Sequence, residues 1–341
     1  MLFRPFAALS LETASRIHAG LTLILSGLLA VASLRLAGVR ARPAAVLLVW
    51  ALILFSRPGQ WNFLLGQITL LVVLGTYVAL AANRRSIVLA GLGLALSLLK
   101  PNFGLPLAVL MLARGQVGGV VFGATVTGIL NLIPLPRLAE LSGGVLKFAA
   151  LFFGGTERYA QSSGPQNELT LYRVDAGGLL GQWLPTPLGW VGSFLVAGLL
   201  LGLVAWIFRR HNRSSTPADP ALAGLFCCAI LLSLYHIWYD LLLLAWPFVG
   251  IVHRLRASAG RVSHLHLLQL GLLILLAVNY ASTYSVIDAV HARGALFRLL
   301  TSLNGTALVM LSGLFALDVT GRVSRLDGAI PSPSPAATHR S

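Results

Sequence analysis

Charged residues are scarce in this sequence. Of its 341 residues, 10% are charged and 57% are hydrophobic, and the mean hydropathy is +0.83. Soluble globular domains carry about a quarter charged residues, so this composition excludes a water-soluble globule. The apolar runs lack the alternating pattern of barrel strands, and lipid offers no partner for backbone amides. The sequence therefore predicts an all-α polytopic membrane protein.

Cysteine is almost absent as well. The two cysteines, Cys227 and Cys228, are adjacent in one apolar run, where they cannot form an ordinary structural disulfide. We interpret them as small packing residues. The sequence shows no cluster of metal-ligating residues, no redox pair and no internal repeat, so we expect neither a metal nor a cofactor.

Eleven apolar runs are candidates for membrane-spanning helices. A hydrocarbon core about 30 Å thick needs about 20 helical residues, and several runs are shorter, so their bounds are approximate. The runs are 17–34, 44–55, 67–82, 87–99, 102–113, 117–133, 189–208, 221–235, 237–252, 265–283 and 300–318. They predict a single transmembrane domain of about eleven helices over residues 1–318, with one longer loop at 134–188 and a disordered tail at 319–341.

Basic residues gather in alternate connections between these runs. One side holds 15 of the 25 basic residues: Arg35, Arg40, Arg42, Arg84, Arg85, Arg114, Arg209, Arg210, Arg213, Arg254, Arg256, Arg261, Arg322, Arg325 and Arg340. The positive-inside rule places this side, and the tail, in the cytoplasm. The other side carries most acids: Glu140, Glu157, Glu168, Asp175, Asp240 and Asp288. The net charge of +15 thus indicates topology and attraction to anionic lipid headgroups, and we expect no nucleic-acid partner.

An odd number of crossings has a consequence for the N-terminus. With the tail inside, eleven crossings leave Met1 outside, although no cleavable signal peptide precedes the first run. Residues 1–16 resemble an amphipathic lead-in, with Ser10 as a helix cap and Glu12 in the first turn. We expect that a preceding helix is missing from the sequence.

Two short connections on the expected outer side carry polar residues that a turn does not need. The first, Arg57-Pro58-Gly59-Gln60-Trp61-Asn62, is a tight loop that supplies a charge, two amides and a stacking ring, as a sugar or phosphate ligand would require. A capped turn with an interfacial Trp61 is the alternative. In the second, Pro101 breaks the helix beside Lys100, and a lipid phosphate would satisfy both the charge and the freed backbone groups. Simple snorkelling of Lys100 is the alternative.

The long loop and one further block complete the polar set. Residues 154–175 are polar and suit either a lid over an acceptor site or an ordinary solvated loop. The block Tyr235-His236-Ile237-Trp238-Tyr239-Asp240 is the strongest signal. Aromatic-belt residues account for its rings, but not for His236 and Asp240, which lie four apart and share a face if the segment is helical. We interpret that pair as a ligand-binding or catalytic pair, with a structural cap as the alternative.

These segments together resemble a known family. The succession Gly59-Gln60-Trp61-Asn62-Phe63-Leu64-Leu65, Gly91 to Leu99, Lys100-Pro101, and the block at 235–240 with Leu241 to Pro247 is similar to bacterial membrane glycosyltransferases of family 87. That family includes polyprenol-phosphate-mannose-dependent α-1,2-mannosyltransferases. The resemblance implies a GT-C fold, a polyprenyl-phosphate-linked sugar donor, a lipid or glycan acceptor, and an active site at the outer face of the bacterial inner membrane.

Sugar transfer needs cations near the leaving phosphate and a carboxylate near the acceptor hydroxyl. We therefore assign the phosphate to Lys100 and Arg57, the sugar to Gln60 and Asn62, and the leaving group or acceptor to His236, with Asp240 and Glu168 as candidate bases. Further substrate contacts are expected from Asn102, Asn167, Arg173 and Tyr239.

Family members usually begin with one more helix and an outer loop bearing an Asp taken as the base, followed by a Pro-rich stretch like Phe3 to Leu9. This sequence starts at that stretch. We therefore expect either a mis-assigned start or a member without the usual base. An inactive homologue and a transporter of lipid-linked sugars are the alternatives to an active enzyme, and the transporter is disfavoured because ionisable residues lie at the ends of the runs.

Overall fold

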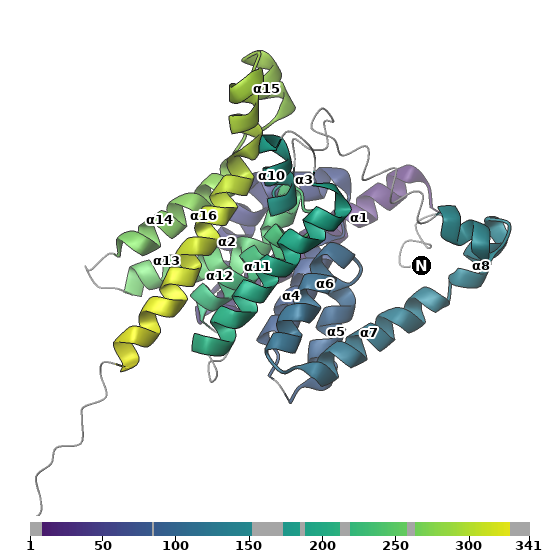
Figure 1. Cartoon of the computed structure of the whole chain (residues 1–341), viewed down its shortest axis with the longest axis horizontal. Coiled ribbons are helices and arrows are strands. Elements are labelled where there is room, and N and C mark those ends of the chain that lie inside the picture. The colour runs from purple at the N-terminus through teal and green to yellow at the C-terminus, as the bar shows by residue number, and fades with distance from the viewer. Residues whose placement is uncertain are drawn as a thin grey trace, which may run out of the picture.

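The computed structural model describes residues 9–83, 85–151, 173–184, 188–211, 219–257 and 263–327. The chain is helical through most of these ranges (Figure 1). The elements are α1 (Leu11–Leu36), α2 (Pro43–Phe55), α3 (Arg57–Leu65), α4 (Thr69–Ala81), α5 (Ile87–Ser97), α6 (Pro101–Ala113), α7 (Val117–Leu132), α8 (Leu135–Leu141), α10 (Ala176–Trp183), α11 (Gly189–His211), α12 (Pro220–Ser233), the 3-10 helix η3 (Trp238–Leu244), α13 (Ala245–Ala257), α14 (His264–Val278), α15 (Tyr284–Ala289) and α16 (Gly294–Asp327).

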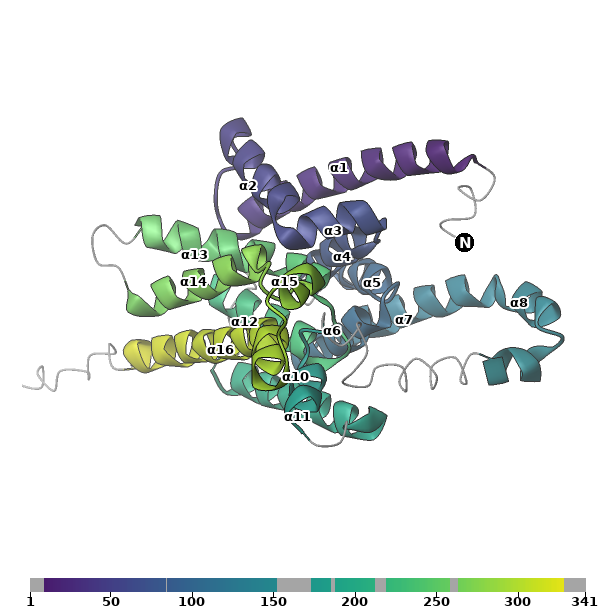
Figure 2. The same ribbon diagram turned by 90° about the horizontal axis from the view of Figure 1, so that it is seen from above.

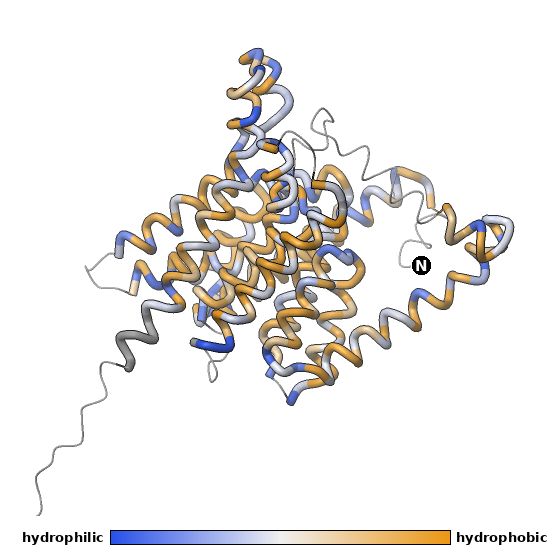
Figure 3. Tube along the Cα trace, viewed as in Figure 1, coloured by the Kyte–Doolittle hydropathy of each residue, from blue (hydrophilic) through white to orange (hydrophobic). Residues whose placement is uncertain are grey.

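The bundle is organised around α12. All residues of α12 from Pro220 to Ser233 are buried, and α6, α11, α13 and α16 pack around it. Apolar residues cover the length of the helices, while hydrophilic residues concentrate at helix ends (Figure 3). Such a distribution suits a multi-pass membrane protein, since lipid and not water solvates the sides of the bundle.

Each of the eleven predicted runs contains a helix, but helix length does not settle how many cross the membrane. Four stretches of described helix are long and apolar enough to span: Leu11–Leu36, Val117–Leu141, Val191–Arg210 and Gly294–Gly321. A fifth results if α2 and α3, which are bent by 70° relative to each other, form one broken span. The shorter apolar helices have 10–17 residues, so eleven crossings remain a prediction.

Glycine pairs let α5 approach both α4 and α7 closely. A Cβ added to Gly93 of α5 would lie 2.7 Å from the carbonyl oxygen of Gly75 in α4. A Cβ added to Gly123 of α7 would likewise lie 2.7 Å from the carbonyl oxygen of Gly91, on α5. In lipid, such small-residue contacts are a main source of helix association because no hydrophobic effect drives it. These contacts fix α4 and α5 relative to each other. Thr69 is the first residue of α4, and Lys100 follows the last residue of α5 by three positions.

The expected tight loop at 57–62 is wrong: these residues form helix α3. Ser56 caps the helix by accepting from the Gly59 N–H, and Pro58 lies in the first turn, where a missing N–H costs nothing. Glycine is required at 59, since a Cβ there would lie 1.8 Å from the Ile53 carbonyl oxygen. The Pro-Gly pair therefore marks a sharp junction between two helices and not a turn.

Other boundaries differ less from expectation. The predicted cap is confirmed, because Ser10 accepts from the Thr13 N–H and α1 starts at Leu11. The free, buried Cys227 and Cys228 are packing residues, as predicted. The loop at 134–188 contains α8, α10 and helical residues 145–151, and α16 continues to Asp327, into the expected tail. Arg84, Arg213, Arg261, Arg340 and the stretch Phe3 to Ala8 lie outside the described residues.

Candidate active site

The block at 235–240 lies in a break between helices. α12 ends at Ser233, and the 3-10 helix η3 begins at Trp238 and leads directly into α13. His236 and Asp240 are both buried, and Nδ1 of His236 lies 2.9 Å from Oδ2 of Asp240. The predicted contact between them therefore exists, although His236 precedes η3 and the two residues do not share a regular helix.

Lys100 reaches the same carboxylate from a second break. α5 ends at Ser97 and α6 begins at Pro101, so Lys100 occupies the N-cap position with an extended backbone. Its Nζ donates to Oδ1 of Asp240 at 2.9 Å and to Oγ1 of Thr69, at the start of α4, at 2.7 Å. The Thr69 hydroxyl in turn donates to Asp240 Oδ1 at 3.3 Å. Asp240 is thus held by three side chains from three separate elements.

The His236 ring links Asp240 to the second break. Its Nδ1 faces the Asp240 carboxylate, and its Nε2 lies 3.1 Å from the carbonyl oxygen of Asn102, in the first turn of α6. Lys100, His236 and Asp240 therefore form a trio, in which the Lys100 ammonium is the group that suits an anionic ligand.

Lys100 is the member of the trio that a ligand can reach. Its side chain is 15% exposed, against 0% for His236 and 2% for Asp240. An ammonium has three N–H donors, and in the described part of the chain two of these are used by Thr69 and Asp240. The ammonium also lies 4.6 Å from the centre of the Tyr239 ring. One donor remains for a bound anion, framed by an aromatic face.

Helix α3 supports η3 from the other side. Arg57 is buried, donates to the Asn279 carbonyl and lies 4.3 Å from the centre of the Trp238 ring. Asn62 is also buried and donates to the Tyr239 carbonyl at 2.9 Å. Both side chains therefore hold the start of η3 in place.

Gln60, on α3, is partly exposed. Its Oε1 accepts from the hydroxyl of Tyr280 at 2.8 Å, and both groups are accessible. Next to Gln60, Trp61 packs its ring edge against Trp238, with centroids 4.9 Å apart. Gln60 and Tyr280 thus form an accessible polar pair next to the ring pair of Trp61 and Trp238.

The structure brings together most of the predicted site residues. Lys100, Asn102, His236, Tyr239 and Asp240 belong to one network, and Arg57 and Asn62 contact it from α3. Arg173 lies at its edge, 5.1 Å from the Tyr235 ring centre. Asn167 and Glu168 lie outside the described residues.

Sequence reasoning overlooked Thr69, Asp175, Asn279 and Tyr280. Thr69 and Asn279 lie near the ends of the predicted runs 67–82 and 265–283, as other polar residues do, so nothing local distinguished them. Asp175, followed by Ala-Gly-Gly, had a usable signal, since it is the N-cap of α10.

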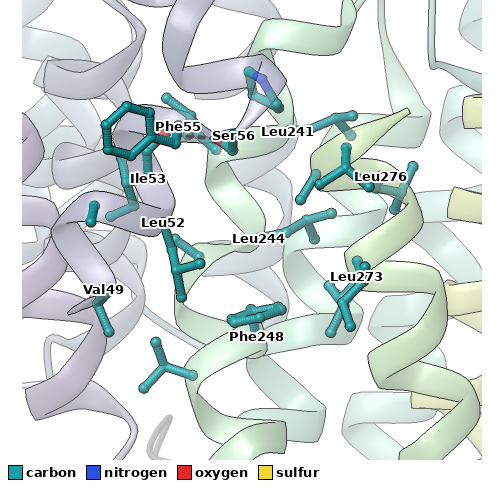
Figure 4. Close-up of a pocket in the computed structure, with 18 of the residues that line it drawn as sticks. Val49, Leu52, Ile53, Phe55, Ser56, Leu241, Leu244, Phe248, Leu273 and Leu276 are labelled. Carbon is teal, nitrogen blue, oxygen red and sulfur yellow. Dashed lines mark hydrogen bonds between the residues drawn. The ribbon is translucent and has the colours of Figure 1, made fainter. Parts of the chain in front are cut away.

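An apolar groove of about 420 Å³ opens beside the network, between α2, η3, α13 and α14 (Figure 4). Val49, Leu52, Leu244, Phe248, Leu273 and Leu276 line it. Three other lining residues, Pro58, Leu241 and Val278, are the chain neighbours of Arg57, Asp240 and Asn279. The groove therefore lies beside the segments that carry the polar network, although no residue of the network lines it. No group of three or more metal-ligating residues occurs in the described ranges.

Comparison with known proteins assigns the chain to a family. A model of glycosyltransferase family 87 matches residues 1–234, which include α3, Thr69, Lys100 and Asn102 and end immediately before Tyr235. Searches of curated proteins and of solved structures found no match. The matched part covers well over half of the chain, so this protein belongs to glycosyltransferase family 87.

Proposed function

We propose that this glycosyltransferase moves a hexose from a polyprenyl-phosphate donor to a lipid or glycan acceptor, and that this hexose is mannose. In this reaction the bond between the anomeric carbon and the phosphate oxygen breaks, and a bond to the acceptor oxygen forms. The acceptor hydroxyl gives up its proton to a base, and polyprenyl phosphate leaves. The site must therefore stabilise a phosphate that gains negative charge as the bond breaks.

The observation that carries the proposal is the reach of Lys100. Its ammonium belongs to the trio of Lys100, His236 and Asp240 and keeps one donor free of the described protein groups. A phosphate diester that becomes a monoester gains charge in the transition state, and a fixed cation stabilises that state more than the ground state. In this assignment Asp240 and His236 hold Lys100 in place and contribute no direct contact to the substrate.

The apolar groove supports a lipid-linked donor over a soluble nucleotide sugar. Its walls consist of leucine, valine and phenylalanine side chains, and Phe55 at its edge is 76% exposed. A hydrocarbon tail in the groove would bring its phosphate close to α3 and η3, which carry Arg57 and Asp240 next to the lining residues Pro58 and Leu241. A charged nucleotide would find no partner along such a wall.

The accessible residues on α3 and at Tyr280 suit the sugar and the acceptor. Gln60 and the Tyr280 hydroxyl provide hydrogen-bond groups, and Trp61 provides a stacking surface beside them. We assign the sugar to this patch. Membership of a glycosyltransferase family favours the enzyme over an inactive homologue or a transporter.

Sugar transfer is tested directly with purified protein in proteoliposomes. We expect release of polyprenyl phosphate from polyprenyl-phosphate-mannose when a bacterial lipid extract supplies the acceptor, and no transfer from GDP-mannose. Lysine labelled with ¹³C at Cε gives a second readout, since the chain has two lysines, Lys100 and Lys147. Polyprenyl phosphate should shift the Lys100 signal. The signal of Lys147, an exposed residue in the helical stretch 145–151, should not change. Transfer from GDP-mannose, or a shift of neither signal, would contradict the proposal.

We also propose that the site end of the bundle faces outward. α15 lies beyond that end, and α11 finishes at the opposite end with Arg209 and Arg210 (Figure 1). In intact cells, an impermeant maleimide should label Tyr284→Cys, on α15, and should spare Arg210→Cys. Both positions are exposed, and the natural Cys227 and Cys228 are buried, so background labelling is low. Labelling at 210 but not at 284 would place the site in the cytoplasm.

A further inference from the structure

The backbone of His236 is held by a segment far away in the sequence. Between α12 and η3 the chain is extended, with φ of −124° at Leu234 and −116° at Ile237. Backbone groups in such a break have no helical partners, and within a membrane bundle they need partners from elsewhere. The His236 carbonyl accepts from the Val174 N–H at 2.9 Å, and the His236 N–H donates to Oδ2 of Asp175 at 3.3 Å. Both backbone polar groups of His236 thus depend on residues 174 and 175.

Asp175 uses its whole carboxylate for this purpose. Oδ1 accepts from Arg173 Nη2 at 2.7 Å and from the Gly178 N–H at 2.8 Å, which caps α10. Oδ2 accepts from Arg173 Nε at 3.0 Å and from His236. Two oxygens provide about four acceptor positions, and four donors occupy them. Asp175 is therefore a buried anion with fixed partners and has no lone pair available for a substrate.

The surroundings of Asp175 fix its position further. The Arg173 guanidinium that binds it lies 5.1 Å from the Tyr235 ring centre, and Arg173 pairs with Ile237 as a β-bridge. Gly178 is required for this packing, since a Cβ there would lie 2.8 Å from Cβ and Nε of Arg173. α10 packs against α11, α12 and α16, and the view from above shows α3 apart from it (Figure 2). Both helices lie at the same end of the bundle (Figure 1).

We propose that Asp175 is a positioning residue for sugar transfer, which acts by fixing the backbone of His236. With the backbone of His236 held in place, its ring contacts both Asp240 and the Asn102 carbonyl. Asp240 in turn holds Lys100 at the proposed phosphate position. This inference rests on the proposed function, because it assigns Asp175 to the machinery of that same site. Asp175 itself touches neither donor nor acceptor.

The first test needs no activity. Asp175→Asn keeps the shape of the side chain but replaces one acceptor oxygen by a donor, so it cannot serve both Arg173 and His236. We expect faster hydrogen–deuterium exchange in peptides that cover residues 234–240, measured by mass spectrometry on the purified protein. Asp288→Asn, at an exposed acid on α15, is the matched control and should leave this exchange unchanged. Gly178→Ala displaces Arg173 and retains the carboxylate, and it should raise the exchange rate as well, which secures the test if Asp175→Asn folds poorly.

The second test separates positioning from a general structural role. Displacing a catalytic group by about 1 Å lowers turnover about 100-fold, and we expect a loss of this size in kcat for Asp175→Asn, with little change in KM for the donor. If Asp175 acts through His236, adding Asp175→Asn to His236→Gln should cost nothing further. Additive losses would overturn the proposal, and so would unchanged exchange in both variants. If the wild type transfers sugar from no lipid-linked donor, the proposed function fails, while the exchange result still decides whether Asp175 holds His236.

Discussion

Replacing Lys100 by methionine is expected to abolish most sugar transfer and to destabilise the fold. The ammonium of Lys100 lies 2.9 Å from a carboxylate of Asp240 that is 2% exposed. Removing one member of a buried ion pair costs about 3–5 kcal/mol, because the other charge stays buried without its partner. Loss of a fixed cation beside the leaving phosphate should lower kcat about 100- to 1,000-fold. Turnover in proteoliposomes and thermal unfolding in detergent measure the two effects.

Lys147→Met is the matched control, since Lys147 is exposed and the chain has no third lysine. It should match the wild type in both measurements. The double variant Lys100→Met/Asp240→Asn should regain part of the lost stability, as it removes the unpaired buried charge, but it should regain no activity. A Lys100→Met variant that keeps full turnover would show that the phosphate binds elsewhere. Lys100→Arg is not a conservative change here, because a planar guanidinium cannot reproduce three tetrahedral donors.

Replacing Asp240 by asparagine is expected to lower kcat about 100-fold or more, through displacement of Lys100 and His236. Both carboxylate oxygens are engaged by these two side chains and by Thr69. A carboxylate held in this way orients its partners, and it would have to release one of them to accept a proton from the acceptor. We therefore expect the loss of activity at low pH, the acidic limb of the profile of kcat/KM, to persist in Asp240→Asn.

The pH profile distinguishes this role from that of a base. If Asp240 removes the acceptor proton, Asp240→Asn should abolish the acidic limb and leave a rate that no longer depends on pH there. Glu168→Gln is the companion variant, because Glu168 is the other candidate base in the sequence. An acidic limb lost in Glu168→Gln and kept in Asp240→Asn would assign the base to Glu168. The reverse result would make Asp240 the base and overturn the orienting role.

Several parts of the site followed from the sequence because their causes are local. Pro101 cannot continue the preceding helix, so a break beside Lys100 was predictable, and the structure has it. The block at 235–240 contained polar groups that the membrane interface did not explain, and His236 and Asp240 do contact each other. Each charged residue in an apolar chain is costly to place in lipid, whatever its neighbours are. The few charged residues of this sequence therefore indicate where a polar site is buried.

Other parts could not be predicted, because they depend on which helices meet. Thr69 and Asp240 are 171 residues apart, and Asp175 and His236 are 61 apart, so no local pattern links them. The Pro-Gly pair at 58–59 permits either a turn or a helix start, and the sequence reasoning chose the turn. The close approach of Gly59 to the Ile53 carbonyl belongs to the junction between α2 and α3, where these two residues are six positions apart.

By itself the sequence determined the class of protein, the position of a helix in each of the eleven apolar runs and the two breaks that carry Lys100 and His236. These features depend on the transfer of apolar side chains into lipid and on the backbone restrictions of proline, and both act within a single segment. The sequence did not predict α3, α8, α10 or α15. Only the tertiary structure decided that the two breaks face each other across Asp240, that α3 and the residues from 173 to 175 hold η3 and His236, and that an apolar groove lies beside them. The reason is that helix pairing in lipid depends on close contacts between small residues and on partners for stranded polar groups, and both arise only when distant segments pack together.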